Sequence, residues 1–239
     1  YDVGGVFYSK KRKVLTSASF TSWKRERHFF DEETAQLFKN LEKHLGDYEL
    51  GISSSSKDEN MFIVRTYSDR SLGAYYLYNK EEDKIAKIQE VSPWLDENEM
   101  PNVYPISYTA RDSLVIPGYL TLPKGLTVET AKELPVVVNP HGGPWARDNW
   151  GFNPEIQFLA NRGYGVLQMN FRGSTGYGRE FMEKSFKQWG LTMQNDITDG
   201  VYWLINQGIA DKDKVAIYGG SYGGYATLQG VVVTPTLYA

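Results

Sequence analysis

The stretch that decides the fold is Val215-Ala-Ile-Tyr-Gly-Gly-Ser-Tyr-Gly-Gly-Tyr225, near the end of the 239-residue chain. Its first residues are apolar, as in a buried strand, and the residues after Ser221 are compatible with a helix. Between them stands G-x-S-x-G, whose small residues let the backbone bend sharply and hold the Ser221 hydroxyl clear of a sheet. The stretch therefore predicts a strand, a tight turn that carries Ser221, and a helix.

This pattern is typical of the nucleophile elbow of α/β-hydrolases, in which a serine forms an ester with the acyl group that it transfers. We interpret Ser221 as that nucleophile, because a chance match in a glycine-rich loop would lack the flanking strand and helix. In this fold the triad runs in the order Ser, Asp or Glu, His. The 18 residues after Ser221 contain no Asp, Glu or His. We therefore expect both partners beyond residue 239 and little activity from the chain alone.

The composition disfavours several other classes of protein. A net charge of −3 and a pI near 5.7 show no bias toward nucleic acid or an anionic membrane surface. No apolar run approaches the roughly 18 residues of a membrane span. The absence of cysteine excludes disulfides and thiolate metal sites, and it leaves cytoplasm and periplasm equally open. No metal-ligand spacing and no phosphate-loop motif is present, so we expect no cofactor.

The first hundred residues have the texture of short strands. Gly5–Ser9 and Val14–Phe20 predict a hairpin, and helical spacing over Asp31–Leu45 predicts a helix with Asp31 as its N-cap and Gly46 after its end. Four further strands are predicted at Tyr48–Ser53, Met61–Ser68, Ala74–Asn79 and Lys84–Gln89. Four antiparallel strands within about 45 residues is the size of one β-propeller blade, and a sandwich is the alternative.

Beyond the proline-rich connection Ser92–Pro105, strands and helices alternate. The predicted strands are Leu114–Leu122, Leu134–Asn139, Tyr164–Asn170 and Lys214–Tyr218, and the predicted helices are Ile156–Arg162, Gly178–Gln188, Met193–Gln207 and Tyr222–Val232. This alternation predicts an α/β class with a parallel core. The expected fold is an incomplete α/β-hydrolase sheet at 105–239, preceded at 1–104 by the C-terminal part of a β-propeller.

A second motif, His141-Gly-Gly-Pro144, follows the predicted strand Leu134–Asn139. In α/β-hydrolases the backbone N–H after the nucleophile and an N–H from such a loop form the oxyanion hole. Those roles fall to Tyr222 and Gly143. His141 precedes the serine, so we reject it as the general base and expect its side chain to hold the loop by a hydrogen bond.

Several other polar residues have simpler interpretations than catalysis. His28 and His44 lie in the strand-rich half and are interpreted as surface or interdomain residues. For Arg172, a structural role and contact with a substrate carboxylate are both open. Asp196 and Asp199 lie near the start of a predicted helix, where capping is favoured over catalysis.

Taken in order, His141-Gly-Gly-Pro, Phe171-Arg-Gly-Ser-Thr-Gly-Tyr-Gly and Gly219-Gly-Ser-Tyr-Gly-Gly-Tyr resemble the prolyl oligopeptidase family, most closely its acylaminoacyl-peptidase and dipeptidyl-peptidase branch. The resemblance covers about residues 105–239. It implies a serine peptidase that cleaves short peptides through an acyl-enzyme beneath a propeller, with a downstream Asp and His. It implies an oligopeptide substrate, no nucleic-acid or membrane partner, and leaves homo-oligomerisation open. A carboxylesterase on the same fold and a non-catalytic peptide-binding module are the alternatives.

Overall fold

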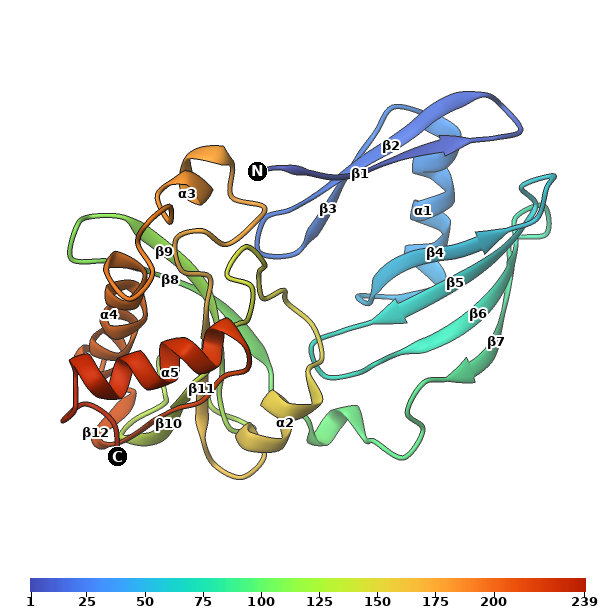
Figure 1. Ribbon diagram of the computed structural model, residues 1–239. Coiled ribbons are helices and arrows are strands. Elements are labelled where there is room, and N and C mark those ends of the chain that lie inside the picture. The colour runs from blue at the N-terminus through green and yellow to red at the C-terminus, as the bar shows by residue number, and fades with distance from the viewer. The chain divides into compact units, whose positions relative to one another are not determined.

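The computed structural model describes all residues from 1 to 239 and contains two compact units (Figure 1). One unit comprises Val3–Glu99. The other comprises Met100–Ala239 together with Tyr1–Asp2. None of the helices is both long and apolar enough to span a lipid bilayer.

The Val3–Glu99 unit is built from two antiparallel sheets and one long helix. Its elements are β1 (Val3–Ser9), β2 (Val14–Thr21), β3 (Arg25–Phe29), α1 (Glu32–Leu45), β4 (Glu49–Ser55), β5 (Met61–Tyr67), β6 (Ala74–Asn79), β7 (Lys84–Glu90) and a 3-10 turn, η1 (Glu97–Glu99). The sheet orders are β1-β2-β3 and β4-β5-β6-β7. The predicted hairpin, the four-strand run and the helix are confirmed.

The ends of α1 follow from its sequence. The Asp31 carboxylate accepts a hydrogen bond from the Thr34 N–H at 2.8 Å, and Gly46 ends the helix with a φ of 69°. The apolar stripe of α1 buries Leu37, Phe38 and Leu41 against strands of the four-stranded sheet. These contacts form the core of this unit.

The Met100–Ala239 unit is a mixed five-stranded sheet with helices. Its elements are β8 (Val103–Thr109), β9 (Val115–Thr121), β10 (Leu134–Val138), α2 (Pro154–Ala160), β11 (Gly165–Met169), α3 (Arg179–Glu183), α4 (Thr192–Asn206), β12 (Ala210–Ile217) and α5 (Tyr222–Val233). The strand order is β12-β10-β11-β9-β8, with β10 parallel to both of its neighbours and β8 and β9 antiparallel. The predicted α/β class with a parallel core is confirmed for this unit.

The parallel pairing of β10 with β12 positions the two motifs. The register places Val138 opposite Ile217, and the Tyr218 N–H donates to the Val138 carbonyl at 2.9 Å. Parallel strands end at the same edge of a sheet, so the segments that follow them emerge side by side. The His141 loop and the Ser221 turn are therefore neighbours, although they are far apart in sequence.

Four elements differ from the prediction. The strands β3 and β8 were not predicted, because neither Arg25–Phe29 nor the segment around Pro105 has a strong strand pattern. The helix expected over residues 178–188 is only α3, since the chain turns after Glu183 and Lys187 takes a φ of 60°. Residues around Ala210 already belong to β12, which therefore starts earlier than expected.

Candidate active site

Ser221 occupies the turn between β12 and α5 in a conformation that non-glycine residues rarely adopt. Its φ is 55° and its ψ is −121°. A non-glycine residue persists there only when the surrounding structure enforces it, and such strain gathers at functional sites. The residue is exposed, and its hydroxyl makes no hydrogen bond within the chain.

Glycines let the main chains of the two loops touch. A Cβ on Gly223 would lie 2.1 Å from the Pro140 carbonyl oxygen, and one on Gly219 would lie 2.7 Å from the same atom. On the other side, a Cβ on Gly142 would lie 3.4 Å from the Ser221 Cβ. The Ser221 turn therefore packs backbone to backbone against the loop that begins at Pro140.

Two backbone amides of these loops have no acceptor. The N–H of Tyr222 belongs to the first turn of α5, where amides lack a partner inside the helix. The N–H of Gly143 also makes no hydrogen bond, and Gly143 takes a φ of 126° that favours glycine. Both amides are spare donors close to Ser221 in the fold. Their service as an oxyanion hole remains a prediction.

His141 holds the loop, as expected from the sequence. Its ring stacks on Phe171 at a centroid distance of 4.3 Å, its Nδ1 lies 2.7 Å from the Gly142 carbonyl oxygen, and its Nε2 lies 2.8 Å from Ser174 Oγ. Burial lowers the pKa of His141 to about 4, so the ring is neutral at pH 7. A carbonyl only accepts, which assigns the proton to Nδ1. Ser174 Oγ also lies 2.7 Å from the Phe171 carbonyl oxygen, so its one proton is shared between that carbonyl and His141 Nε2.

Replacing Ser174 with alanine is expected to lower kcat about tenfold in the intact protein. The change removes the Ser174 hydroxyl from both His141 Nε2 and the Phe171 carbonyl, which costs about 1–3 kcal/mol and loosens the loop that carries Gly143. Steady-state kinetics and thermal unfolding measure the two effects. Thr175→Ala is the matched control, because the Thr175 hydroxyl makes no hydrogen bond. Equal kcat values for the two variants would show that the contact does not position the loop.

Arg172 is 5% exposed and is bound by carboxylates of the chain itself. Its Nε and Nη2 donate to the two oxygens of Asp196 at 2.8 and 2.7 Å, and its Nη1 lies 2.8 Å from Asp112 Oδ2. Burial alone would lower the pKa of Arg172, but the two carboxylates raise it, so the group stays charged. Of the two roles left open, these contacts favour the structural one.

Asp196 and Asp199 do not cap a helix, and that prediction is wrong. Both lie within α4, beyond its first turn. The Asp196 carboxylate also accepts from the Arg172 backbone N–H at 3.0 Å, and Asp199 pairs with Arg111 at 2.7 Å. The Arg172–Asp196 pair fixes the start of the loop that carries Ser174.

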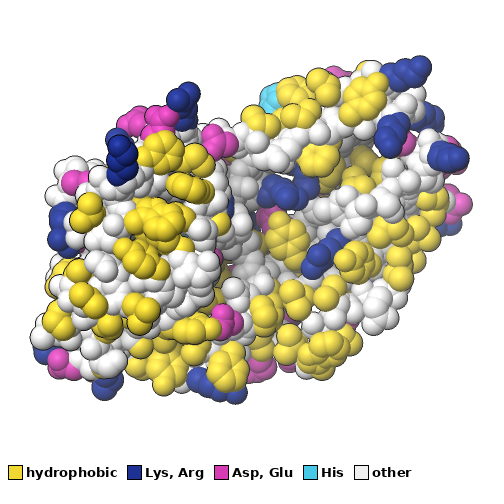
Figure 2. All heavy atoms as spheres, viewed as in Figure 1, with side chains coloured by type: hydrophobic (Ala, Val, Ile, Leu, Met, Phe, Trp, Pro, Cys, Tyr) yellow, Lys and Arg dark blue, Asp and Glu magenta, His cyan; other side chains and the backbone are white.

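A set of aromatic side chains beside Ser221 was missed in the sequence. It consists of Trp145, Phe186, Trp189, Tyr222 and Tyr225, here called the aromatic shelf. Trp189 lies 5.2 Å from the Tyr222 ring and 6.4 Å from the Trp145 ring. Hydrophobic side chains gather on this unit between the positions of α3 and α5 (Figures 1 and 2). The shelf offers an apolar surface to one side of the elbow. In the sequence, the feature that could have indicated it is Trp145, which lies two residues after Gly143.

The chain offers no general base next to Ser221. His141 is engaged as described, and His28 and His44 belong to the Val3–Glu99 unit. His44 contacts Asp83 at 2.9 Å and His28 is exposed. No group of three or more His, Asp or Glu side chains is placed to hold a metal ion.

The strand order, the strained serine turn and the two spare amides together define an α/β-hydrolase domain. Residues 150–239 match the model of the prolyl oligopeptidase family. The chain is 34% identical to dipeptidyl aminopeptidase BIII of Pseudoxanthomonas mexicana, covering 100% of this chain and 35% of that protein. It is 31% identical to dipeptidyl peptidase family member 6 of Caenorhabditis elegans, covering 99% and 34%.

The crystal structure of puromycin hydrolase superposes with a TM-score of 0.65 at 26% identity, covering 80% of this chain and 29% of that one. The chain belongs to the prolyl oligopeptidase family. It spans about a third of the length of the curated relatives it matches.

Proposed function

We propose that the protein is a serine peptidase that cleaves short peptides through an acyl-enzyme. The observation that carries the proposal is Ser221, whose unbonded hydroxyl stands in a strained turn against a loop with a spare amide. In the proposed reaction, Ser221 Oγ attacks the scissile carbonyl carbon and its proton passes to a base. The N–H groups of Gly143 and Tyr222 hold the oxyanion, the amine leaves with a proton, and water then releases the acyl group.

A general base is part of this proposal. A serine hydroxyl is a weak nucleophile at neutral pH unless a base takes its proton. His141, the histidine of the unit that contains Ser221, is held by Gly142 and Ser174, so we propose that the base and its orienting acid come from outside these 239 residues. The predicted weak activity of the isolated chain follows from the same reasoning.

We also propose the finer domain assignment made from the sequence. The four-stranded antiparallel meander β4–β7 has the form of one propeller blade. Residues 1–104 would then be the C-terminal part of a propeller and residues 105–239 the N-terminal part of the peptidase domain. The relatives named as dipeptidyl peptidases support a preference for short peptides.

Covalent labelling tests the proposed nucleophile. A fluorophosphonate probe is expected to label the intact protein at Ser221, because the probe's phosphorus accepts an activated serine oxygen as a carbonyl carbon does. Peptide mass spectrometry locates the label, and exposed Ser107 is the internal control. Failure to label Ser221 in folded protein would favour the non-catalytic binding module.

Substrate ranking separates a peptidase from a carboxylesterase. Turnover of a dipeptide p-nitroanilide, acetyl-alanine p-nitroanilide and p-nitrophenyl butyrate is compared at equal enzyme concentration. We expect kcat/KM to be higher for one of the anilides, and for apolar side chains next to the scissile bond, which the aromatic shelf can contact. A ranking led by the butyrate would support the esterase.

A further inference from the structure

The Val3–Glu99 unit contains a cavity of its own, between the β1–β2–β3 sheet, α1 and the strands β4 and β5. Its volume is about 220 Å³. Its apolar lining includes Leu37, Phe38 and Phe62, none of which is more than 7% exposed. These side chains are shielded from bulk solvent and still border empty space. Phe7 and Tyr8, which are about half exposed, also line the cavity, so it is a pocket with an apolar floor that opens to solvent and is large enough for a small molecule.

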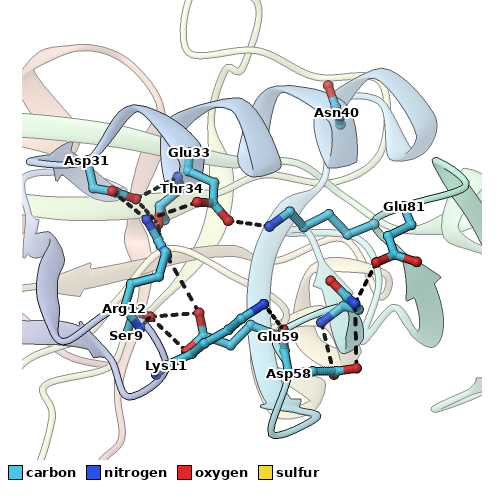
Figure 3. A network of polar contacts seen from close by, with 12 residues as sticks. Ser9, Lys11, Arg12, Asp31, Glu33, Thr34, Asn40, Asp58, Glu59 and Glu81 are labelled. Atoms are coloured by element: carbon cyan, nitrogen blue, oxygen red, sulfur yellow. Dashed lines mark hydrogen bonds and ion pairs between the residues drawn. The ribbon is translucent and has the colours of Figure 1, made fainter.

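One end of the pocket carries a network in which the carboxylates outnumber the cations (Figure 3). Arg12 binds Asp31 at 2.5 Å and Glu33 at 3.3 Å, and Lys80 pairs with Glu33. The Glu59 carboxylate accepts from the Ser9 hydroxyl at 2.7 Å. The cations at this end already have carboxylate partners, so they are not available to a ligand.

The opposite wall carries two arginines that have no such partner. Arg25 and Arg27 are two residues apart on β3, so their side chains share one face of the strand, and both line the pocket. Arg25 makes no hydrogen bond or ion pair. Arg27 donates to the Leu50 carbonyl at 2.6 Å and lies over the Phe38 ring at 4.3 Å, without a carboxylate.

Arg27 is partly buried and Arg25 is exposed, and their like charges repel each other. Burial lowers the pKa of Arg27 and the charge of Arg25 lowers it further, while the more distant Glu49 and Glu42 offset only part of this effect. An anion placed between the two side chains would relieve this repulsion. Lys and Arg side chains border the hollow of this unit in Figure 2.

We propose that this pocket binds a small organic carboxylate that carries an apolar group. Arg25 and Arg27 would hold the carboxylate, since guanidinium groups match its planar, two-oxygen geometry. The apolar group would lie against Leu37, Phe38 and Phe62. Ser17, which is 3% exposed and lines the pocket, adds a hydroxyl donor. The volume suits one aromatic or branched aliphatic group, as found in a peptide's C-terminal residue or in a free acid.

Calorimetric titration of the intact protein with three probes tests the ligand class. N-acetyl-L-phenylalanine and 3-phenylpropanoate share an aromatic ring and a carboxylate, whereas N-acetyl-L-phenylalaninamide lacks the charge. We expect at least one acid to bind at least about tenfold more tightly than the amide. Tighter binding of the acetylated amino acid indicates a peptide C-terminus, and tighter binding of 3-phenylpropanoate indicates a free acid. An amide that binds as tightly as both acids overturns the proposal.

Variants at the wall test the site itself. Arg25→Gln removes a charge that holds nothing else in place, and it is expected to weaken binding of the preferred acid about tenfold. Arg65→Gln is the matched control, because it removes the same charge from β5 of the same unit, and Arg65 does not line the pocket. Arg27→Lys retains the positive charge at the second arginine. Thermal unfolding of each variant checks that it is folded. Unchanged affinity in folded Arg25→Gln protein would overturn the proposal. This test is independent of Ser221 and of peptidase activity.

Discussion

Replacing Ser221 with alanine is expected to reduce kcat for a peptide anilide by about 10⁶-fold in the intact protein. In the proposed mechanism, the change removes the oxygen that forms the acyl-enzyme. The two amides and the aromatic shelf remain, so the residual rate reflects binding and oxyanion stabilisation alone. Because the Ser221 hydroxyl makes no hydrogen bond and alanine meets the same strained φ of 55°, the free energy of unfolding should change by less than about 0.5 kcal/mol.

Steady-state kinetics and denaturant unfolding of the same preparation measure both quantities. The control is Ser107→Ala, which alters an exposed serine on β8 and should leave kcat unchanged. If Ser221→Ala protein is folded and keeps a tenth or more of the activity, the nucleophile lies elsewhere and the proposed mechanism fails.

Replacing Gly223 with alanine is expected to lower kcat by about 10²–10³-fold and to destabilise the fold by about 1–3 kcal/mol. The new Cβ would lie 2.1 Å from the Pro140 carbonyl oxygen, a distance that backbone atoms cannot accommodate without moving. Separating the two loops moves the amide of Gly143 away from that of Tyr222. If the two amides form the proposed oxyanion hole, a substrate carbonyl oxygen between them then loses a donor.

Gly220→Ala provides the matched control for the stability measurement. A Cβ at Gly220 meets nothing within 4 Å, so its free energy of unfolding should stay close to that of the original protein. Kinetics with an anilide substrate measure the loss in Gly223→Ala. A Gly223→Ala protein that unfolds like Gly220→Ala and keeps its kcat would show that the two loops need not touch.

Features encoded in short stretches could be predicted from the sequence. The turn at Ser221 and the N-cap at Asp31 each depend on a few consecutive residues, and both are present. The motif pattern of α/β-hydrolases predicted that the His141 loop and Ser221 lie close together, and the parallel pairing of β10 with β12 brings them to one edge of the sheet. In each case the local pattern and the topology of the fold agree.

Features that depend on distant partners could not be predicted in this way. Asp196 was taken for a capping residue, because nothing near it in sequence indicates that Arg172 will bury its guanidinium there. The strand β3 is rich in charge and is stabilised by pairing with β2. The aromatic shelf brings Trp145 and Trp189 from two separate loops to Tyr222 and Tyr225 of α5, and only the tertiary fold places them together.

The close backbone contact of Pro140 with Gly219 and Gly223 distinguishes two parts of the site, which differ in how well they tolerate amino-acid substitution. The part that would stabilise negative charge consists of main-chain atoms and of residues without side chains. Substitutions that change the size of a side chain therefore cannot adjust its geometry in small steps. Around it, Trp145 and Trp189 are about half exposed and can be exchanged without moving the backbone. Substrate preference can therefore diverge among relatives while the chemical step is kept.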